Sequence, residues 1–413
     1  MLWQPSLPET YRTLSEDELA ARIDARRKEL GDSLFILGHH YQTDPIIRHA
    51  DATGDSLKLS QVAARVAKER PVKYVVFCGV HFMAETADML TPDHVAVILP
   101  DLSAGCSMAD MAQYDDTVEA WDSIQRVIKD AGLNARVVPI TYVNSSAAIK
   151  AFVGAHGGAC CTSSNARQVF AWARAGGTIH TRPGEEIKVL FLPDQHLGRN
   201  TAAAAGIDVA TRAALYDPRA AHAGKELGGS TRGAIERAEV ILWAGHCSVH
   251  KLFRPEHCRT IREENERERA AGATREGVKI LVHPECCKEV VDLADLSGST
   301  EFIIQTIRAA APGLRWAVGT ETHLVGRLAK EAAARGVEVR ILSDCQCLCT
   351  TMYRIDEPHL LWVLDHLVGG LSKDGKAKIV NQISVPGKVR EQALLAVDRM
   401  LELSKPGAKS SVD

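Results

Sequence analysis

The chain has 413 residues and a formal net charge of −3 at pH 7, with apolar and charged fractions ordinary for a globular protein. This length exceeds what one hydrophobic core normally organises, so we expect two to three domains. The charge balance excludes the basic surface that binds nucleic acids or anionic membranes, and no apolar run reaches the roughly 20 residues of a membrane-spanning helix.

The N-terminal segment lacks the basic start and apolar stretch of a secretory signal, so we expect a cytoplasmic protein. Eleven cysteines then favour metal binding or chemistry over disulfides, because thiols stay reduced in that compartment. Sixteen histidines also favour a metal site.

Taken in chain order, the sequence carries one pattern three times. Each copy begins with a β-rich apolar run that ends in a polar triplet, continues through a helical stretch, and reaches a small-residue turn before another helix. The copies begin at SLFILGHHYQ, at RVVPITYVNS and at VKILVHPECC. A second strand then leads to a cysteine near the end of each copy.

Alternating strands and helices predict an α/β fold with three pseudo-threefold-related, three-layer αβα domains, each with a small parallel sheet. The expected boundaries are residues 30–115 for repeat 1, 116–255 for repeat 2 and 256–353 for repeat 3. Repeat 2 contains a predicted insertion at about 196–233, interpreted as a surface excursion without a chemical role. A helix at 15–30 and C-terminal helices within 355–405 are expected to pack on repeat 1.

The polar triplets lie at the carboxyl ends of strands, where open parallel sheets bind ligands. Side chains two residues apart on an extended strand point the same way, so each triplet projects one pair. The pairs are His39 with Tyr41, Tyr142 with Asn144, and His283 with Glu285. A histidine beside a carboxylate can divide acid and base roles near neutral pH, which makes His283 and Glu285 candidates for proton transfer.

Ser56, Ser163 and Thr300 each stand where a loop turns into a predicted helix. Residues of these types often cap helices, and capping alone would explain any one of them. Exposed N–H groups at a helix start also attract phosphate and carboxylate, so the same positions are candidate substrate contacts.

One cysteine stands at a matching position in each repeat, which selects Cys106, Cys247 and Cys349. A 4Fe–4S cluster usually takes four thiolates, so three would leave one iron open as a Lewis acid. The three domains are therefore expected to surround a central 4Fe–4S site. His250 follows Cys247 by three residues and is expected near that site.

Two other interpretations of these cysteines stay open. They can be ordinary core residues, since free cysteine is among the most buried residue types. Cys345, Cys347 and Cys349 can also form a local zinc site, although zinc sites normally show wider spacing and a second pair. The spacing from Tyr41 to Cys106 and that from Glu285 to Cys349 differ by one residue, which favours Cys349 within the run.

In this order the motifs resemble the quinolinate synthase family, over most of the chain from GHHYQTDPIIRHADATGDSLKLS to LCTTMYRIDEPHLLWVLD. The resemblance implies a transferase-type enzyme of NAD biosynthesis that condenses iminosuccinate with dihydroxyacetone phosphate to give quinolinate, phosphate and water. It also implies a three-cysteine 4Fe–4S cluster whose open iron acts as Lewis acid. Some family members carry a CxxCxxC run where this chain has CxCxC, so Cys347 is an alternate third ligand.

The resemblance also assigns roles to residues at the matching positions of this sequence. The implied catalytic residues are Glu285, His283 and Tyr41. The implied substrate contacts are His39, Ser56, Phe82, Tyr142, Asn144, Ser163, His250, Ser299 and Thr300, and the implied cluster ligands are Cys106, Cys247 and Cys349.

The expected partners are the two small-molecule substrates, with a functional link to L-aspartate oxidase and with no nucleic acid or membrane. One rival is a diphthamide-synthesis-type iron–sulfur enzyme, which uses a similar triplicated plan. The other is a non-catalytic iron–sulfur redox sensor.

Overall fold

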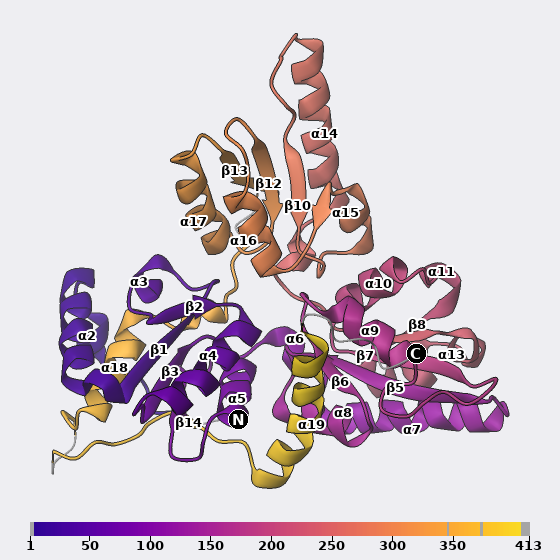
Figure 1. Cartoon of the computed structure of the whole chain (residues 1–413), viewed down its shortest axis with the longest axis horizontal. Coiled ribbons are helices and arrows are strands. Elements are labelled where there is room, and N and C mark those ends of the chain that lie inside the picture. The colour runs from indigo at the N-terminus through magenta and orange to yellow at the C-terminus, as the bar shows by residue number, and fades with distance from the viewer. Residues whose placement is uncertain (1–3, 345–346, 372–374, 406–413) are drawn as a thin grey trace. The chain divides into compact units, whose positions relative to one another are not determined.

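A computed structural model describes residues 4–344, 347–371 and 375–405 (Figure 1). The chain divides into two compact units: unit 1 comprises Met1–Cys106 and Leu348–Pro386, and unit 2 comprises Ser107–Cys347 and Gly387–Asp413. Within the described residues, no helix combines the length and apolar character needed to cross a membrane.

Unit 1 holds repeat 1 as far as Cys106, the end of repeat 3 from Leu348, and part of the C-terminal segment. Its strands are β1 Leu34–His39, β2 Ala52–Gly54, β3 Tyr74–Cys78, β4 Ala96–Ile98 and β14 Gln382–Ile383. Its helices are α1 Glu9–Arg12, α2 Glu16–Leu30, η1 Gly31–Ser33, α3 Asp44–Ile47, α4 Ser56–Glu69, α5 His81–Leu90, η4 Met352–Arg354 and α18 Glu357–Leu367.

The sheet of unit 1 has the strand order β14-β4-β3-β1-β2. Every residue of β1 is buried, as expected for a parallel strand whose two faces are both covered. The register pairs His39 with Gly54 and Gly38 with Cys78, so the strands end together at one edge. β14 adds an antiparallel edge strand, which the predicted parallel sheet did not include; such a strand needs no crossover helix.

Unit 2 holds the end of repeat 1 from Ser107, all of repeat 2, and repeat 3 as far as Cys347. Its strands are β5 Ala135–Tyr142, β6 Ala159–Cys161, β7 Glu186–Leu192, β8 Ala213–Tyr216, β9 Val240–Trp243, β10 Lys279–Val282, β11 Leu296–Ser297, β12 Arg315–Gly319 and β13 Glu338–Ile341. Its first helices are α6 Ser107–Asp110, α7 Tyr114–Asp130, α8 Ala147–Ala155, α9 Ala166–Arg174, α10 Gln195–Ala204, α11 Val209–Arg212, α12 Pro218–His222, η2 Glu226–Gly229 and α13 Arg232–Arg237. The later ones are η3 His250–Leu252, α14 Pro255–Ala270, α15 Lys288–Leu293, α16 Thr300–Arg308, α17 Thr322–Ala333 and α19 Gly387–Leu403.

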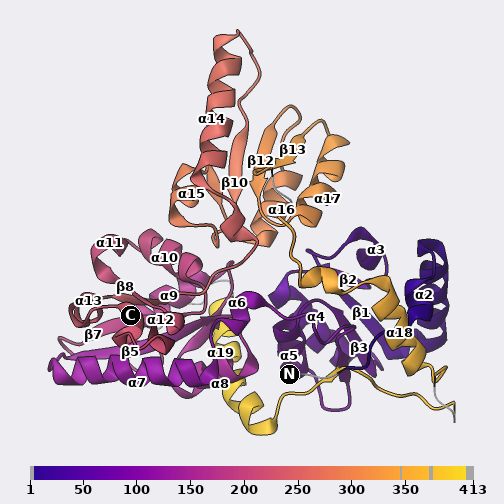
Figure 2. The same ribbon diagram turned by 180° about the vertical axis from the view of Figure 1, so that it is seen from behind.

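The two sheets of unit 2 have the orders β6-β5-β7-β9-β8 and β11-β10-β12-β13. When the edge strands β8 and β14 are set aside, the three sheets formed by the described residues share one order: second, first, third and fourth strand of the repeat. Helices flank each sheet (Figures 1 and 2). The predicted α/β fold with three small αβα groups is therefore confirmed.

The predicted insertion in repeat 2 begins later than expected. α10 follows the third strand of its repeat, as α5 and α17 do in theirs, so it belongs to the common pattern. The added segment contains α11, β8, α12, η2 and α13, and β8 extends the sheet by pairing in parallel with β9. The small residues of α10 made this helix look like part of the insertion.

The two C-terminal helices pack in different places. α18 lies against α2 in unit 1 (Figure 2). α19 packs on α8 and β6 of repeat 2, which corrects the expectation that it packs on repeat 1. Gly154 allows the close approach, because a Cβ there would lie 2.0 Å from the Gln392 carbonyl oxygen. Arg399 also donates from Nη1 to the Gly158 carbonyl at 2.6 Å. The boundaries expected between the repeats stay a prediction.

Candidate active site

His39 and Tyr41 form the polar pair at the end of β1 in unit 1. His39 is buried, and its Nδ1 accepts a hydrogen bond from the Tyr41 backbone N–H at 3.1 Å. A neutral His39 ring therefore carries its proton on Nε2. The Tyr41 ring meets the His39 ring edge-on, with 4.8 Å between centroids, and Tyr41 is partly exposed.

Tyr142 and Asn144 follow β5 in repeat 2. Tyr142 is buried and its hydroxyl donates a hydrogen bond to Glu285. The Asn144 Oδ1 atom is buried and has no hydrogen-bond partner within the described residues. Since an unsatisfied buried acceptor is costly, this oxygen is suited to an N–H or O–H group of a bound ligand.

His283 and Glu285 follow β10 in repeat 3 and meet His250 of repeat 2. His250 Nδ1 lies 2.8 Å from Glu285 Oε2, and the His250 and His283 rings stack with 4.4 Å between centroids. His283 Nδ1 accepts a hydrogen bond from the Glu285 N–H at 3.3 Å. All three side chains are almost fully buried. The predicted proton-transfer pair thus lies in one buried cluster with Tyr142 and His250.

The charges in this cluster follow from burial and from its neighbours. Burial, and then the nearby His250, lower the pKa of His283 to about 3, so the ring is neutral at pH 7. Burial alone would raise the pKa of Glu285, but the nearby His250 and the hydrogen bonds from His250 and Tyr142 outweigh it and lower that pKa to about 2. Glu285 is therefore an ionised carboxylate beside a neutral imidazole.

Two residues that support this cluster were missed by sequence reasoning. Thr320 is fully buried, and its Oγ1 lies 3.2 Å from His250 Nε2. Asp194 is also fully buried and accepts from the Leu197 N–H at 2.6 Å and from the Cys247 N–H at 3.2 Å. Burial, and then the charge of Glu285, raise the pKa of Asp194. Both residues follow the third strand of their repeats, a position that could have been searched for polar side chains.

Ser56, Ser163 and Thr300, which the sequence placed at helix starts, are not the N-caps of their helices. Asp55 is the N-cap of α4 and accepts from the Lys58 N–H at 2.9 Å, while Ser56 is the first helical residue. Ser299 caps α16 and accepts from the Phe302 N–H at 3.3 Å, while Thr300 is the first helical residue.

Ser163 stands in the turn before α9, whose N-cap is Asn165. Capping therefore explains Ser299 but not Ser56, Ser163 or Thr300. The remaining predicted contact, Phe82, is buried within α5.

The cysteines separate by exposure. Cys106, Cys247 and Cys349 are all partly exposed, and Cys287 is the other partly exposed one among the described cysteines. The buried cysteines are Cys78, Cys160, Cys161, Cys258, Cys286 and Cys347. Burial raises the pKa of Cys78 and of Cys160 to about 12 and also raises that of Cys287. Since metal ligation needs an accessible thiolate, the buried set fits the core and the predicted three fit a cluster.

The surroundings of the three cysteines agree with that fit. In unit 2, Cys247 Sγ and ligand atoms of His250 and Glu285 all lie within 4.8 Å of one another. In unit 1, Arg354 donates to Ser103 Oγ at 3.1 Å and so ties the segment after Cys349 to the segment before Cys106.

Cys347, the alternate third cluster ligand, differs from Cys349 in burial. Cys347 is fully buried, with its Sγ 3.1 Å from Ser343 Oγ, whereas Cys349 is partly exposed. Cys345 lies outside the described residues. Both sulfurs contact a hydroxyl, since Cys349 Sγ lies 3.5 Å from Thr351 Oγ1, so burial separates them. Because a fully buried sulfur is poorly placed to reach a cluster, Cys349 is the better candidate.

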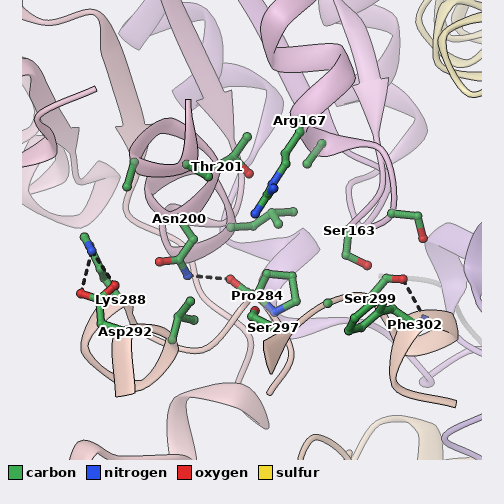
Figure 3. Close-up of a pocket in the computed structure, with 17 residues that line it drawn as sticks. Ser163, Arg167, Asn200, Thr201, Pro284, Lys288, Asp292, Ser297, Ser299 and Phe302 are labelled. Atoms are coloured by element: carbon green, nitrogen blue, oxygen red, sulfur yellow. Dashed lines mark hydrogen bonds and ion pairs between the residues drawn. The ribbon is translucent and has the colours of Figure 1, made fainter. Parts of the chain in front are cut away.

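A pocket of about 510 Å³ opens between repeats 2 and 3 within unit 2 (Figure 3). Two predicted substrate contacts, Ser163 and Ser299, line it. Asn200 of α10 also lines it and donates to the carbonyl oxygens of Pro284 and Cys286, at 2.8 and 2.9 Å. α10 thus holds the loop that carries Glu285, although the sequence placed this helix in an insertion without chemistry.

Comparison with known proteins agrees with the geometry. The family described as Quinolinate synthetase A protein matches residues 21–402. A protein of Anoxybacillus flavithermus named quinolinate synthase is 48% identical over 96% of this chain and 96% of its own. Proteins with the same name from Herpetosiphon aurantiacus and Rhodopirellula baltica are 48% and 47% identical, covering 96% and 95% of this chain and 95% and 92% of their own.

Proposed function

This chain belongs to the quinolinate synthase family, and from this premise we propose that it condenses iminosuccinate with dihydroxyacetone phosphate to give quinolinate in NAD biosynthesis. Phosphate and two waters leave as the pyridine ring closes and becomes aromatic. The observation that carries the proposal is the buried cluster of Glu285, His250, His283 and Tyr142 beside Cys247.

Glu285 and His283 are the proposed proton-transfer groups. Glu285 is ionised and buried, so it can accept a proton from the nucleophilic carbon of iminosuccinate. His283 is neutral and its Nδ1 is held by a backbone N–H, so its Nε2–H can donate to a substrate oxygen that gains charge. Tyr41 is the third proposed catalytic residue, and its hydroxyl would assist isomerisation of the triose or ring closure.

The substrate contacts are proposed from the same arrangement. Asn144 offers a buried oxygen that lacks a partner within the described residues and suits an N–H or O–H group of a substrate. Ser163 and Ser299 would bind the anionic groups from the pocket side. The other proposed contacts are Thr300, next to Ser299, and His39, Ser56 and Phe82 of unit 1. Tyr142 and His250 would orient Glu285 as well as touch substrate.

Cys106, Cys247 and Cys349 would hold the 4Fe–4S cluster. The chemistry that such a cluster supplies when bound is Lewis acidity at the iron without a protein thiolate, which assists the loss of hydroxide. Asp194 accepts from the Cys247 N–H at 3.2 Å and so fixes the backbone of one ligand.

A cytoplasmic location and a functional link to L-aspartate oxidase belong to the same proposal. The imine substrate hydrolyses in water, so an enzyme that oxidises aspartate must supply it continuously. The family assignment removes the diphthamide-synthesis alternative.

The test is an anaerobic assay of cluster-reconstituted protein. Iminosuccinate would be generated in place from aspartate, dihydroxyacetone phosphate added, and quinolinate separated by chromatography. We expect quinolinate from the wild type and none from Cys106→Ala. A protein with a full cluster that makes no quinolinate would contradict the proposal.

A further inference from the structure

The pocket between repeats 2 and 3 contains a charged residue that the proposed site does not use. Its charged lining residues are Arg167, Lys288 and Asp292. Lys288 Nζ lies 2.6 Å from Asp292 Oδ2, so these two charges neutralise each other. Arg167 forms no hydrogen bond or ion pair within the described residues, which leaves the pocket with one uncompensated positive charge.

Arg167 extends from α9 into the space that Ser163 and Ser299 also line (Figure 3). Two of the neighbouring polar side chains, Asn200 and Ser299, also bond to the protein itself. Asn200 Nδ2 donates to two carbonyl oxygens of the repeat-3 loop, and Ser299 Oγ accepts from the Phe302 N–H. Among the described residues, the guanidinium of Arg167 is the charged donor in the pocket that no carboxylate neutralises, and it is exposed to solvent and to incoming ligands.

We propose that Arg167 binds an oxyanion of a substrate in this pocket and so favours substrates that carry a carboxylate or phosphate at that end. The proposal rests on the proposed function, whose two substrates are both anions. A planar guanidinium presents paired N–H donors that match carboxylate and phosphate oxygens. The shared chemistry is a bidentate oxyanion, and the source is either the phosphate of the triose or a carboxylate of iminosuccinate.

The geometry makes Arg167 a binding residue and not a proton-transfer residue. It lies on the α9 side of the pocket, while Glu285 and His283 are buried in the neighbouring cluster. Because Arg167 is exposed, its attraction for an anion is screened by salt. A contribution from Arg167 is thus expected in KM and in the ionic-strength dependence of KM, with little effect on kcat.

The test uses the holoenzyme with Arg167→Gln and Arg167→Lys. The matched control is Arg126→Gln, which removes an exposed charge from α7, away from the pocket, at a residue that likewise forms no ion pair within the described part of the chain. KM would be measured for each substrate with the other saturating, at low and high ionic strength. We expect Arg167→Gln to raise KM for one substrate about tenfold and to flatten its salt dependence, as for loss of a charged hydrogen bond.

The two sources give different results. A KM increase for dihydroxyacetone phosphate alone assigns Arg167 to the phosphate, and an increase for iminosuccinate alone assigns it to a carboxylate. Arg167→Lys should keep most of the affinity and the salt dependence, because it keeps the charge. Unchanged KM values in Arg167→Gln, or an equal increase in Arg126→Gln, would overturn the proposal.

A binding measurement separates this proposal from the proposed function. Inorganic phosphate and succinate would be titrated separately into the wild-type holoenzyme and Arg167→Gln by calorimetry. Weaker binding of one anion to the variant supports the Arg167 site even if no quinolinate is formed. Equal binding of both anions by the two proteins would contradict it whatever the activity.

Discussion

The strand ends of repeat 1 and repeat 3 share a backbone and differ in chemistry. In both, the histidine Nδ1 accepts from the backbone N–H two residues later, at 3.1 Å for His39 and 3.3 Å for His283. In both, the histidine carbonyl accepts from the N–H three residues later at 3.0 Å. The repeated sequence therefore sets the same loop and the same histidine tautomer twice.

The residue two positions after the histidine makes the difference. In repeat 1 it is Tyr41, partly exposed and edge-on to the His39 ring. In repeat 3 it is Glu285, which is buried and bonded to His250 and Tyr142. A repeated loop can thus keep its backbone conformation while the residue at one position differs. That position carries a hydroxyl in repeat 1 and a buried carboxylate in repeat 3.

The largest expected effect distinguishes these two side chains directly. We expect Glu285→Gln to lower kcat about a thousandfold, because it removes a proton acceptor without changing the shape of the side chain. Tyr41→Phe removes one hydrogen-bonding group and should lower kcat about tenfold. Both would be measured as quinolinate formation under saturating substrates.

Iron content would serve as the control for both variants, since a loss of cluster would lower activity for a different reason. If Glu285→Gln kept activity close to that of Tyr41→Phe, the assigned difference between the two strand ends would be wrong.

An intermediate effect concerns the pH dependence of folding. The pKa of His283 is lowered from 6.5 to about 3 in the fold, so the unfolded chain takes up a proton below pH 6.5 and the folded chain does not until about pH 3. The cluster-free protein should therefore lose stability as pH falls through this window. Between pH 7 and pH 5, His283 should lower the free energy of unfolding by about 2 kcal/mol.

Urea unfolding of cluster-free wild type and His283→Gln at pH 7 and pH 5 checks this. The variant should lose less stability on acidification. Part of the decline will remain, because the pKa of His196 is also lowered, to about 4, by burial and by Arg199. An identical decline in both proteins would show that His283 is protonated in the fold.

The smallest expected effect is at Thr320, the anchor of His250. Thr320→Val removes one buried hydrogen bond to His250 Nε2 with little change of shape, and we expect kcat to fall about fivefold. Thr320→Ser keeps the hydroxyl and should restore most of the activity. If both variants behaved alike in their kcat and its pH profile, Thr320 would be only a packing residue.

Much of the fold could be predicted from local pattern. Buried parallel strands such as β1 appear as continuous apolar runs, and polar residues directly after them mark the strand ends. The threefold repetition then identified three α/β groups. The pairing of His283 with Glu285 needed only the spacing of side chains along the chain.

Features that depend on distant contacts could not be predicted. α19 is amphipathic, but only the close approach at Gly154 and the hydrogen bonds of Arg399 place it on repeat 2. Asp194 and Thr320 act through partners far away in the sequence, at Cys247 and His250. Ser56 and Ser163 resembled caps because they stand only one and two positions from the caps Asp55 and Asn165.

The most direct test of the central claim, that each repeat supplies one thiolate to a shared cluster, is the iron and sulfide content of cysteine variants after anaerobic reconstitution. Cys106→Ala, Cys247→Ala and Cys349→Ala should each lose the cluster, while Cys347→Ala and Cys287→Ala should keep it. A full cluster in Cys349→Ala together with its loss in Cys347→Ala would contradict the account.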